Sequence, residues 1–213
     1  KEGALPADNV TTNPDNLLVF GEGRSFGSEF FIRKNSGKLT GWIGYTIART
    51  ERFFPDLQDT WFPARYDRTH DLSIVFNYKI SDKWTFGAAF VYATGNTMTL
   101  PVAWYVHNGR VVFEYGERNT TRMPAYHRLD LSMTWFDDPY RYTLDPETNE
   151  KIKSKKKFRQ NVNFSIFNAY NRQNPYFIYV STEGNPNSGD LRISLQQVAL
   201  FPILPSITWN FNF

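Results

Sequence analysis

The chain has 213 residues, of which 17% are aromatic, and it carries a formal net charge of +3 and no cysteine. No run approaches the ~18 consecutive apolar residues that a membrane-spanning helix needs, so a helical membrane protein is excluded. The small net charge also argues against nucleic acid as a partner, because phosphate binding requires a clustered basic surface. An aromatic-rich sequence without long apolar blocks is typical of strands with one apolar and one polar face.

Seven segments alternate apolar and polar residues with the period of two that indicates such a strand. In chain order they are residues 24–34, 39–50, 70–80, 84–95, 126–136, 157–171 and 205–213. In the fifth segment, for example, Leu129, Leu131 and Met133 alternate with Asp130 and Ser132. Each segment is close to the ~9 to 11 residues of a tilted transmembrane strand. We therefore expect an all-β protein with an antiparallel transmembrane β-barrel segment.

The connections between these segments alternate in length. The sequences NSGK and SDK predict tight turns, whereas residues 51–69, 96–126 and 171–204 predict long loops. Short turns on one side and long loops on the other are the organisation of bacterial outer-membrane barrels. Residues 137–157 fall on the short-turn side, where we expect an extended hairpin with solvated lysines. A soluble β-sandwich is the alternative, because its core would use the same alternating aromatic residues.

The number of strand candidates is odd, whereas single-chain outer-membrane barrels have even numbers with both termini in the periplasm. We therefore expect residues 1–20 to be the remnant of an extracellular loop. Seven strands alone would also leave two open edges in lipid, where unpaired backbone groups are costly. We expect residues 1–213 to be the C-terminal part of one larger barrel domain.

The last segment, PSITWNFNF, places its apolar residues on one side. Such a run of exposed aromatics is a liability unless another element or a membrane covers it. Aromatic residues also gather at the ends of other segments, among them Tyr45, Trp84 and Trp135. In outer-membrane barrels, aromatic rings at these places form girdles at the two membrane surfaces.

The order of these segments resembles the TonB-dependent receptors of Gram-negative outer membranes. Residues 23–50 resemble a late barrel hairpin of that family, and residues 62–101, with YDRTHD at the entry and TGN at the exit, resemble the next one. The sequences MPAYHRLDLSMTW, VNFSIFNAYNRQNPYF and PSITWNFNF resemble the closing strands. The resemblance implies the last seven strands or so of a 22-stranded barrel closed by an N-terminal plug. The plug and the energy-coupling box are expected to lie outside these residues.

The resemblance also implies a function and a set of partners. It implies active uptake of a scarce ligand, such as an iron chelate, vitamin, glycan or peptide, bound by extracellular loops. The implied partners are outer-membrane lipid, the protein's own plug and remaining strands, the TonB-type energy-coupling complex, the barrel assembly machinery and, in some branches of the family, a surface lipoprotein. Trp209, Phe211 and Phe213 are similar to the terminal signal read by the assembly machinery. No cofactor is implied.

Two groups of residues are candidates for contact with ligand or plug. Loop aromatics and cations suit flat ligands and anions, although each could instead pack against neighbouring loops. They are Trp61, Phe62, Arg65, Tyr66, Trp104, Tyr105, His107, Tyr115, Tyr176 and Tyr179. Charged groups on the polar side of the strands could face the plug or lumen, or pair across neighbouring strands. They are Glu29, Arg33, Asp71, Lys79, Arg128, Asp130 and Arg159.

The sequence gives no sign of enzymatic chemistry. His70, His107 and His127 are scattered, and neither a His-Glu-x-x-His nor a Gly-x-Ser-x-Gly motif organises metal or nucleophile chemistry. We therefore expect no catalytic residues and no metal site. The alternative function is a passive porin or a structural, adhesive outer-membrane barrel, which would lack the plug upstream.

Overall fold

The computed structural model describes residues 19–146, 148, 150–186 and 188–213. The loop remnant expected over residues 1–20 therefore falls almost entirely outside the described residues. No helix within the described part of the chain is long and apolar enough to cross a membrane. The secondary structure consists of β-strands in one large antiparallel sheet and four small two-stranded sheets.

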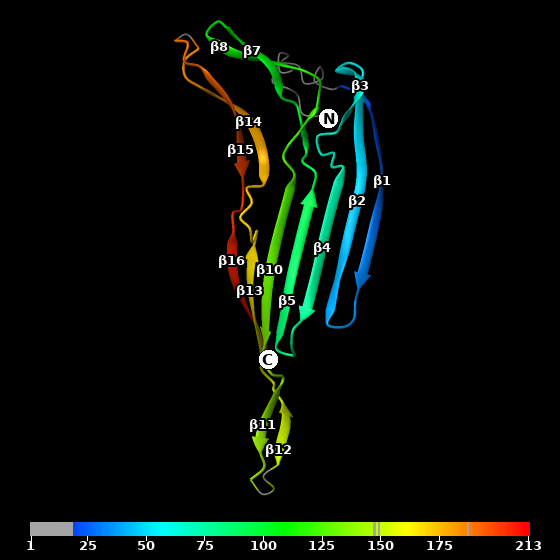
Figure 1. Ribbon diagram of the computed structural model, residues 1–213, viewed down its shortest axis with the longest axis vertical. Coiled ribbons are helices and arrows are strands. Elements are labelled where there is room, and N and C mark those ends of the chain that lie inside the picture. Colours follow the sequence, from blue (N-terminus) through cyan, green and yellow to red (C-terminus); the bar gives the residue numbers. More distant parts are fainter. Residues whose placement is uncertain (1–18, 147, 149, 187) are drawn as a thin grey trace.

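The large sheet confirms the seven expected strands, which lie side by side in chain order (Figure 1). They are β1 (Glu22–Lys34), β2 (Leu39–Phe54), β4 (His70–Lys79), β5 (Trp84–Ala93), β10 (Tyr126–Phe136), β13 (Arg159–Phe167) and β16 (Leu204–Asn212). A further strand, β3 (Gln58–Pro63), pairs with the C-terminal residues of β2. Over the residues that the structure describes, the sheet does not close, so β1 and β16 are its two edges.

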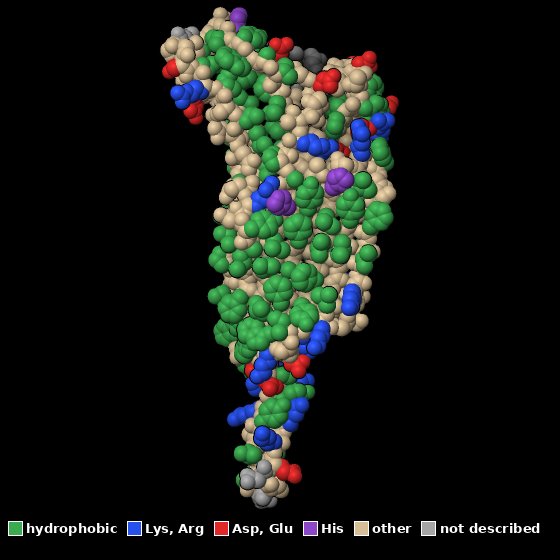
Figure 2. Space-filling model, in the orientation of Figure 1, with side chains coloured by type: hydrophobic (Ala, Val, Ile, Leu, Met, Phe, Trp, Pro, Cys, Tyr) green, Lys and Arg blue, Asp and Glu red, His purple; other side chains and the backbone are tan. Residues whose placement is uncertain are grey.

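One face of this sheet is apolar. The register sets Ile43 opposite Ile74, Ile74 opposite Phe90 and Phe90 opposite Leu129, and directly opposed residues share a face. Figure 2 shows the resulting band of hydrophobic side chains over the middle of the sheet. The small sheets lie at the strand ends, so no second sheet of the described residues covers this band (Figure 1). The packed partner sheet that the soluble β-sandwich alternative requires is thus lacking among these residues.

The opposite face is polar along the same strands. One row across it consists of Asn77, Gly87, Ser132, Ser165 and Ser206. Hydroxyl groups pair within this row, as at the 2.7 Å contact between the Oγ atoms of Ser165 and Ser206. A period of two in the sequence has therefore become two chemically different surfaces of one sheet.

The two ends of the sheet differ as the loop lengths predict. At one end, tight turns join β1 to β2 and β4 to β5. The hairpin expected for residues 137–157 is also present there, formed by β11 (Tyr140–Leu144) and β12 (Lys151–Lys155), and it projects beyond the sheet (Figure 1). We call this the turn end, and the opposite end, which carries the long connections, the loop end.

The long connections contain strands that the alternation pattern did not predict. They are β6 (Thr97–Met98) with β9 (Thr121–Arg122), β7 (Pro101–His107) with β8 (Arg110–Tyr115), and β14 (Pro175–Glu183) with β15 (Arg192–Ala199). Much of β7 and β15 is exposed on both faces, so neither strand shows the contrast between buried and solvated residues that makes a period of two visible.

Candidate ligand-binding site at the loop end of the sheet

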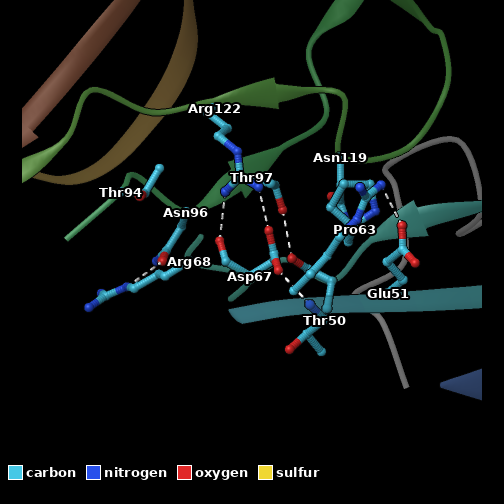
Figure 3. A network of polar contacts seen from close by, with 12 residues as sticks. Thr50, Glu51, Pro63, Asp67, Arg68, Thr94, Asn96, Thr97, Asn119 and Arg122 are labelled. Carbon is cyan, nitrogen blue, oxygen red and sulfur yellow. Dashed lines mark hydrogen bonds and ion pairs between the residues drawn. The ribbon is translucent and has the colours of Figure 1, made fainter. Parts of the chain in front are cut away.

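A buried aspartate ties the bases of the loops together (Figure 3). Asp67, between β3 and β4, is only 1% exposed. Its Oδ1 accepts a 2.6 Å hydrogen bond from the backbone N–H of Thr50, and its Oδ2 is paired with the guanidinium of Arg122. The same guanidinium donates to the carbonyl oxygens of Asp67 and Gly95, at 2.8 and 3.2 Å. Asp67 and Arg122 together thereby link β2, the β3–β4 connection, the exit from β5 and β9.

The sequence TGN after β5 has a structural role in the same network. A Cβ atom on Gly95 would lie 1.8 Å from the carbonyl oxygen of Met123, so the close approach of these two segments requires glycine. The next residue, Asn96, accepts a 3.0 Å hydrogen bond from Nε of Arg68. Thr97 then donates its hydroxyl to the carbonyl of Ala64 at 2.7 Å. The motif residues therefore join two loops to each other.

The sequence FNAYNRQN, which begins at the last residue of β13, forms a second hydrogen-bond network around the buried Asn168 and Asn174. Asn168 adopts a left-handed φ of 54°, which ends the strand at Phe167, four residues before the sequence predicts. Its backbone N–H donates to Oδ1 of Asp130 at 2.9 Å, and its side-chain amide donates to the carbonyls of Arg172 and Phe201 at 3.0 and 3.2 Å. Asn174 continues the pairing of β10, because its amide both accepts from and donates to the backbone of His127.

Next to this network, the Tyr170 hydroxyl lies 2.8 Å from Nδ1 of His127. Burial, the largest cause, raises the pKa of this hydroxyl, whereas the nearby Arg172 lowers it. The net direction is upward, so Tyr170 stays protonated well beyond neutral pH and keeps a proton to donate.

Three clefts surround this rigid base. A cleft of about 530 Å³ lies between the β7–β8 hairpin and β14, and we call it the hairpin cleft. A second, of about 660 Å³, lies between β8 and the turn joining β2 to β3, and we call it the turn cleft. A third, of about 730 Å³, lies on the polar face where β10, β13 and β16 approach the loops, and we call it the face cleft.

Four of the ten predicted loop residues line these clefts. Tyr115 lines both the hairpin cleft and the turn cleft, because it lies at the end of β8 between them. Tyr179 lines the hairpin cleft, Tyr105 the turn cleft and Tyr176 the face cleft. The structure thus brings tyrosines from separate loops around adjoining spaces, although it does not gather all ten into one site.

The other six lie elsewhere. Phe62 is only 2% exposed and packs against Phe54 with ring centroids 6.2 Å apart, so the prediction that its ring is available to a ligand is wrong. Trp61, its neighbour on β3, stacks on Phe53 at 5.5 Å, on the side of the sheet that continues the apolar face. The remaining four are exposed and line none of the three clefts: Arg65, Tyr66, Trp104 and His107.

The seven charged residues predicted for the lumen or plug all fall on the polar face by register. They are Glu29, Arg33, Asp71, Lys79, Arg128, Asp130 and Arg159. The ion pairs that these residues form within the described part of the chain do not cross between strands, and Asp71 pairs with Arg68 just before β4 at 3.9 Å. Arg128 pairs with Asp130 on its own strand at 2.9 Å, and Lys79 pairs with Asp82 in the following turn at 2.6 Å.

Arg128 is held firmly in the wall of the face cleft. Its Nη1 donates to the hydroxyl of Tyr126 at 2.9 Å, its Nε donates to Asp130 at 3.0 Å, and its guanidinium lies 4.0 Å from the ring centroid of Phe167. The face cleft therefore combines a fixed cation, phenol hydroxyls and aromatic rings. Such a lining can hold a flat, polar ligand by stacking and hydrogen bonding.

The sequence missed the apolar lining of the clefts. Phe113 of β8 and Ile178 of β14 line the hairpin cleft, together with Met98. Residues of this kind are common in any loop, and only the approach of the two hairpins makes them neighbours. No group of three or more His, Cys, Asp or Glu that could hold a metal ion is found among the described residues.

Comparison of the chain with protein-family models, with curated proteins and with solved structures found no match. The site is therefore interpreted from its own geometry.

Proposed function

We propose that this chain forms the C-terminal part of the transmembrane barrel of a TonB-dependent receptor in the bacterial outer membrane. The observation that carries the proposal is the uncovered apolar band on one face of seven strands whose other face is polar. A lipid-facing exterior and a wet interior require this arrangement in a barrel. The clefts at the loop end would then receive a scarce ligand from outside the cell.

The edges of the sheet support a larger barrel. Among the described residues, β1 and β16 each pair with one neighbouring strand. In lipid, every unpaired backbone group costs several kcal/mol, so the strand edges must be closed by further strands. The proposal therefore includes the remaining strands of a 22-stranded barrel and a plug inside it. The plug would contact the polar face, and through it the energy-coupling complex would act.

Aromatic rows at both limits of the band support the membrane placement. At the turn end, Trp84 lies opposite Trp135, and Trp209 lies two strands further along in the same row. At the loop end, the row contains Tyr45 and Tyr92 on either side of β4. Rings of this kind are favoured at the two membrane surfaces, where an apolar body and a polar edge are both accommodated.

The membrane placement can be tested with single cysteines, because the chain has none of its own. Ile74→Cys and Ser73→Cys place a fluorescent label on opposite faces of β4. Both are made in the full-length protein in lipid vesicles, after any cysteine outside these 213 residues has been replaced by serine. We expect a lipid-soluble quencher to act on the label at residue 74 and a water-soluble quencher on the label at residue 73. Equal response at both positions would contradict a lipid-facing band.

Active uptake needs its own test, because a passive porin would share the same strands. We expect ligand accumulation by cells to stop when the proton gradient of the inner membrane is collapsed. A passive barrel would continue to equilibrate the ligand, and this result would favour the porin alternative.

A further inference from the structure

An ion-pair cluster lies on the apolar side of the sheet at its loop end. Arg24 of β1 is directly opposite Glu51 of β2, and Arg49 lies two residues from Glu51 on the same face. Nε and Nη2 of Arg24 contact Oε2 of Glu51 at 2.7 and 2.6 Å, and Nη2 of Arg49 contacts Oε1 at 2.6 Å. We call these three residues the rim cluster.

The rim cluster has an excess positive charge on its surface. The Glu51 side chain is 2% exposed, whereas the side chains of Arg24 and Arg49 are 50% and 60% exposed. A buried carboxylate needs one cation to compensate it, and here it holds two. The carboxylate therefore orients both guanidinium groups, and the outer surface of the cluster keeps one net positive charge.

Arg24 is also fixed by stacking. Its guanidinium lies 4.2 Å from the ring centroid of Trp61, which in turn stacks on Phe53 at 5.5 Å. Each guanidinium has five N–H donors, Glu51 uses only some of them, and both side chains are at least half exposed. Two arginines held in place beside each other can bind the oxygens of one phosphate through several charge-assisted hydrogen bonds.

The position of the rim cluster matches the edge of the apolar band. Arg49 lies opposite Phe26, which is 58% exposed, and the next pairs on this face are Ser28 with Ile47 and then Phe30 with Tyr45. Figure 2 shows basic side chains beyond the band toward the loop end. If the band spans the lipid chains, the rim cluster lies at the level of the lipid headgroups, where phosphates are found.

We propose that Arg24 and Arg49 bind the phosphate of a lipid in the outer leaflet, with the lipid chains covering Phe26 and the band below it. The lipid source of the phosphate rests on the membrane placement in the proposed function. Free phosphate has the same chemistry, so the test must separate the two. On this inference Trp61 supports a lipid site on the outside of the barrel rather than a ligand site among the loops.

The test compares the full-length wild-type protein with Arg24→Gln/Arg49→Gln/Glu51→Gln. The triple variant removes all three charges, so no buried carboxylate is left unpaired. Arg110→Gln, at the exposed tip of the β7–β8 hairpin, is the matched control. Each protein is extracted from outer membranes in mild detergent, and the phosphate-bearing lipid that remains bound is counted by native mass spectrometry.

We expect the triple variant to retain at least about tenfold less phosphate-bearing lipid than wild type, a change of about 1.4 kcal/mol in binding. Arg110→Gln should match wild type, and Arg49→Gln alone, which keeps the Arg24–Glu51 pair, should fall between. Equal lipid retention in wild type and the triple variant would overturn the inference.

A second measurement separates the two sources of phosphate. Inorganic phosphate is added to the wild-type protein in nanodiscs that contain lipid A, and the lipid A that remains bound to the protein is measured. The inference expects lipid A to remain bound at millimolar inorganic phosphate. Displacement by inorganic phosphate at that concentration would assign the rim cluster to the free anion and overturn the lipid site. Neither measurement uses ligand uptake. Both results would therefore still test the lipid site if the uptake proposal failed.

Discussion

The base of the loops and their tips are built in different ways, although they belong to the same connections. At the base, Asp67 and Asn168 are almost fully buried, and their polar atoms are paired with backbone and side chains from several segments. At the tips, the β7–β8 and β14–β15 hairpins expose aromatic residues around the clefts. Buried polar pairing therefore fixes where the hairpins start, and the clefts are lined by parts that pack less tightly.

The largest expected effect on the loop base follows from removing the buried carboxylate of Asp67. In Asp67→Ala, Arg122 and the backbone N–H of Thr50 lose their partner, and we expect the loop base to lose about 4 kcal/mol. Hydrogen exchange at the amide of Thr97, which is bonded across the base to Arg65, measures this opening. The control is Asp59→Ala on the exposed part of β3, which should change the exchange by less than about 0.5 kcal/mol. Equal effects of the two changes would remove the distinction between base and surface.

In the second network, two substitutions at Asn168 separate the contribution of its side-chain hydrogen bonds from that of its left-handed backbone. Asn168→Gly removes the side-chain hydrogen bonds but tolerates the left-handed backbone, so we expect a loss of about 2 kcal/mol. Asn168→Ala adds the cost of a Cβ atom in that conformation, about 1 kcal/mol more. Urea unfolding of the full-length protein in vesicles measures both. If alanine proved no worse than glycine, the backbone would contribute nothing to the choice of asparagine.

The tips should behave in the opposite way. Tyr105→Ala removes a half-exposed ring of the β7–β8 hairpin from the wall of the turn cleft, and we expect ligand uptake to fall about tenfold, the effect of losing about 1.4 kcal/mol of binding. The free energy of unfolding should change by less than about 0.5 kcal/mol. Trp104→Ala is the control, because Trp104 is exposed on the same hairpin but lines none of the three clefts. Similar losses of uptake in both variants would mean that the clefts do not define the binding surface.

The smallest expected effect concerns the turn between β14 and β15. A hydrogen bond from the Ser188 hydroxyl, and then one from the backbone N–H of Asn185, lower the pKa of the Asp190 carboxyl below 3.8. A lowered pKa means that this carboxylate supports the turn above the unfolded-state value and loses that support as pH falls through the folded-state value. No change is expected between pH 5 and 8. Carbon NMR of labelled aspartate should show a lower midpoint for Asp190 than for an exposed carboxyl, and an equal midpoint would contradict the assigned hydrogen bonds.

The sequence predicted the sheet because its strands have two chemically different faces. The period of two located all seven strands, and most of its errors are at ends where a loop residue takes over. The strand predicted over residues 157–171 stops at Phe167 because Asn168 turns left-handed, and the strand predicted over 84–95 stops at Ala93, just before the close approach at Gly95. These endings depend on contacts with segments far away in the sequence.

The candidate site was less predictable. Trp61 and Phe62 are adjacent aromatics in a long connection, and the sequence predicts ligand contact for both. In the structure they belong to β3, so they point to opposite sides: Phe62 is buried, and Trp61 stacks with Phe53 and Arg24. A strand over Gln58–Pro63 would have separated their roles, but six residues with mixed exposure do not show a clear period. The sequence therefore identifies Trp61 and Phe62 as aromatic residues of a connection, whereas their tertiary contacts determine whether each ring is buried or exposed.

The β11–β12 hairpin has a practical consequence. It forms a sheet of its own, and its base is held by Lys156, whose Nζ contacts both carboxylate oxygens of Asp137 at 3.0 Å. Because its strands pair only with each other, changes near its tip should combine additively with changes in the large sheet. The tip is therefore a suitable place to insert a short epitope. Antibody access to such an epitope, in intact and in opened cells, would report on which side of the membrane the turn end lies.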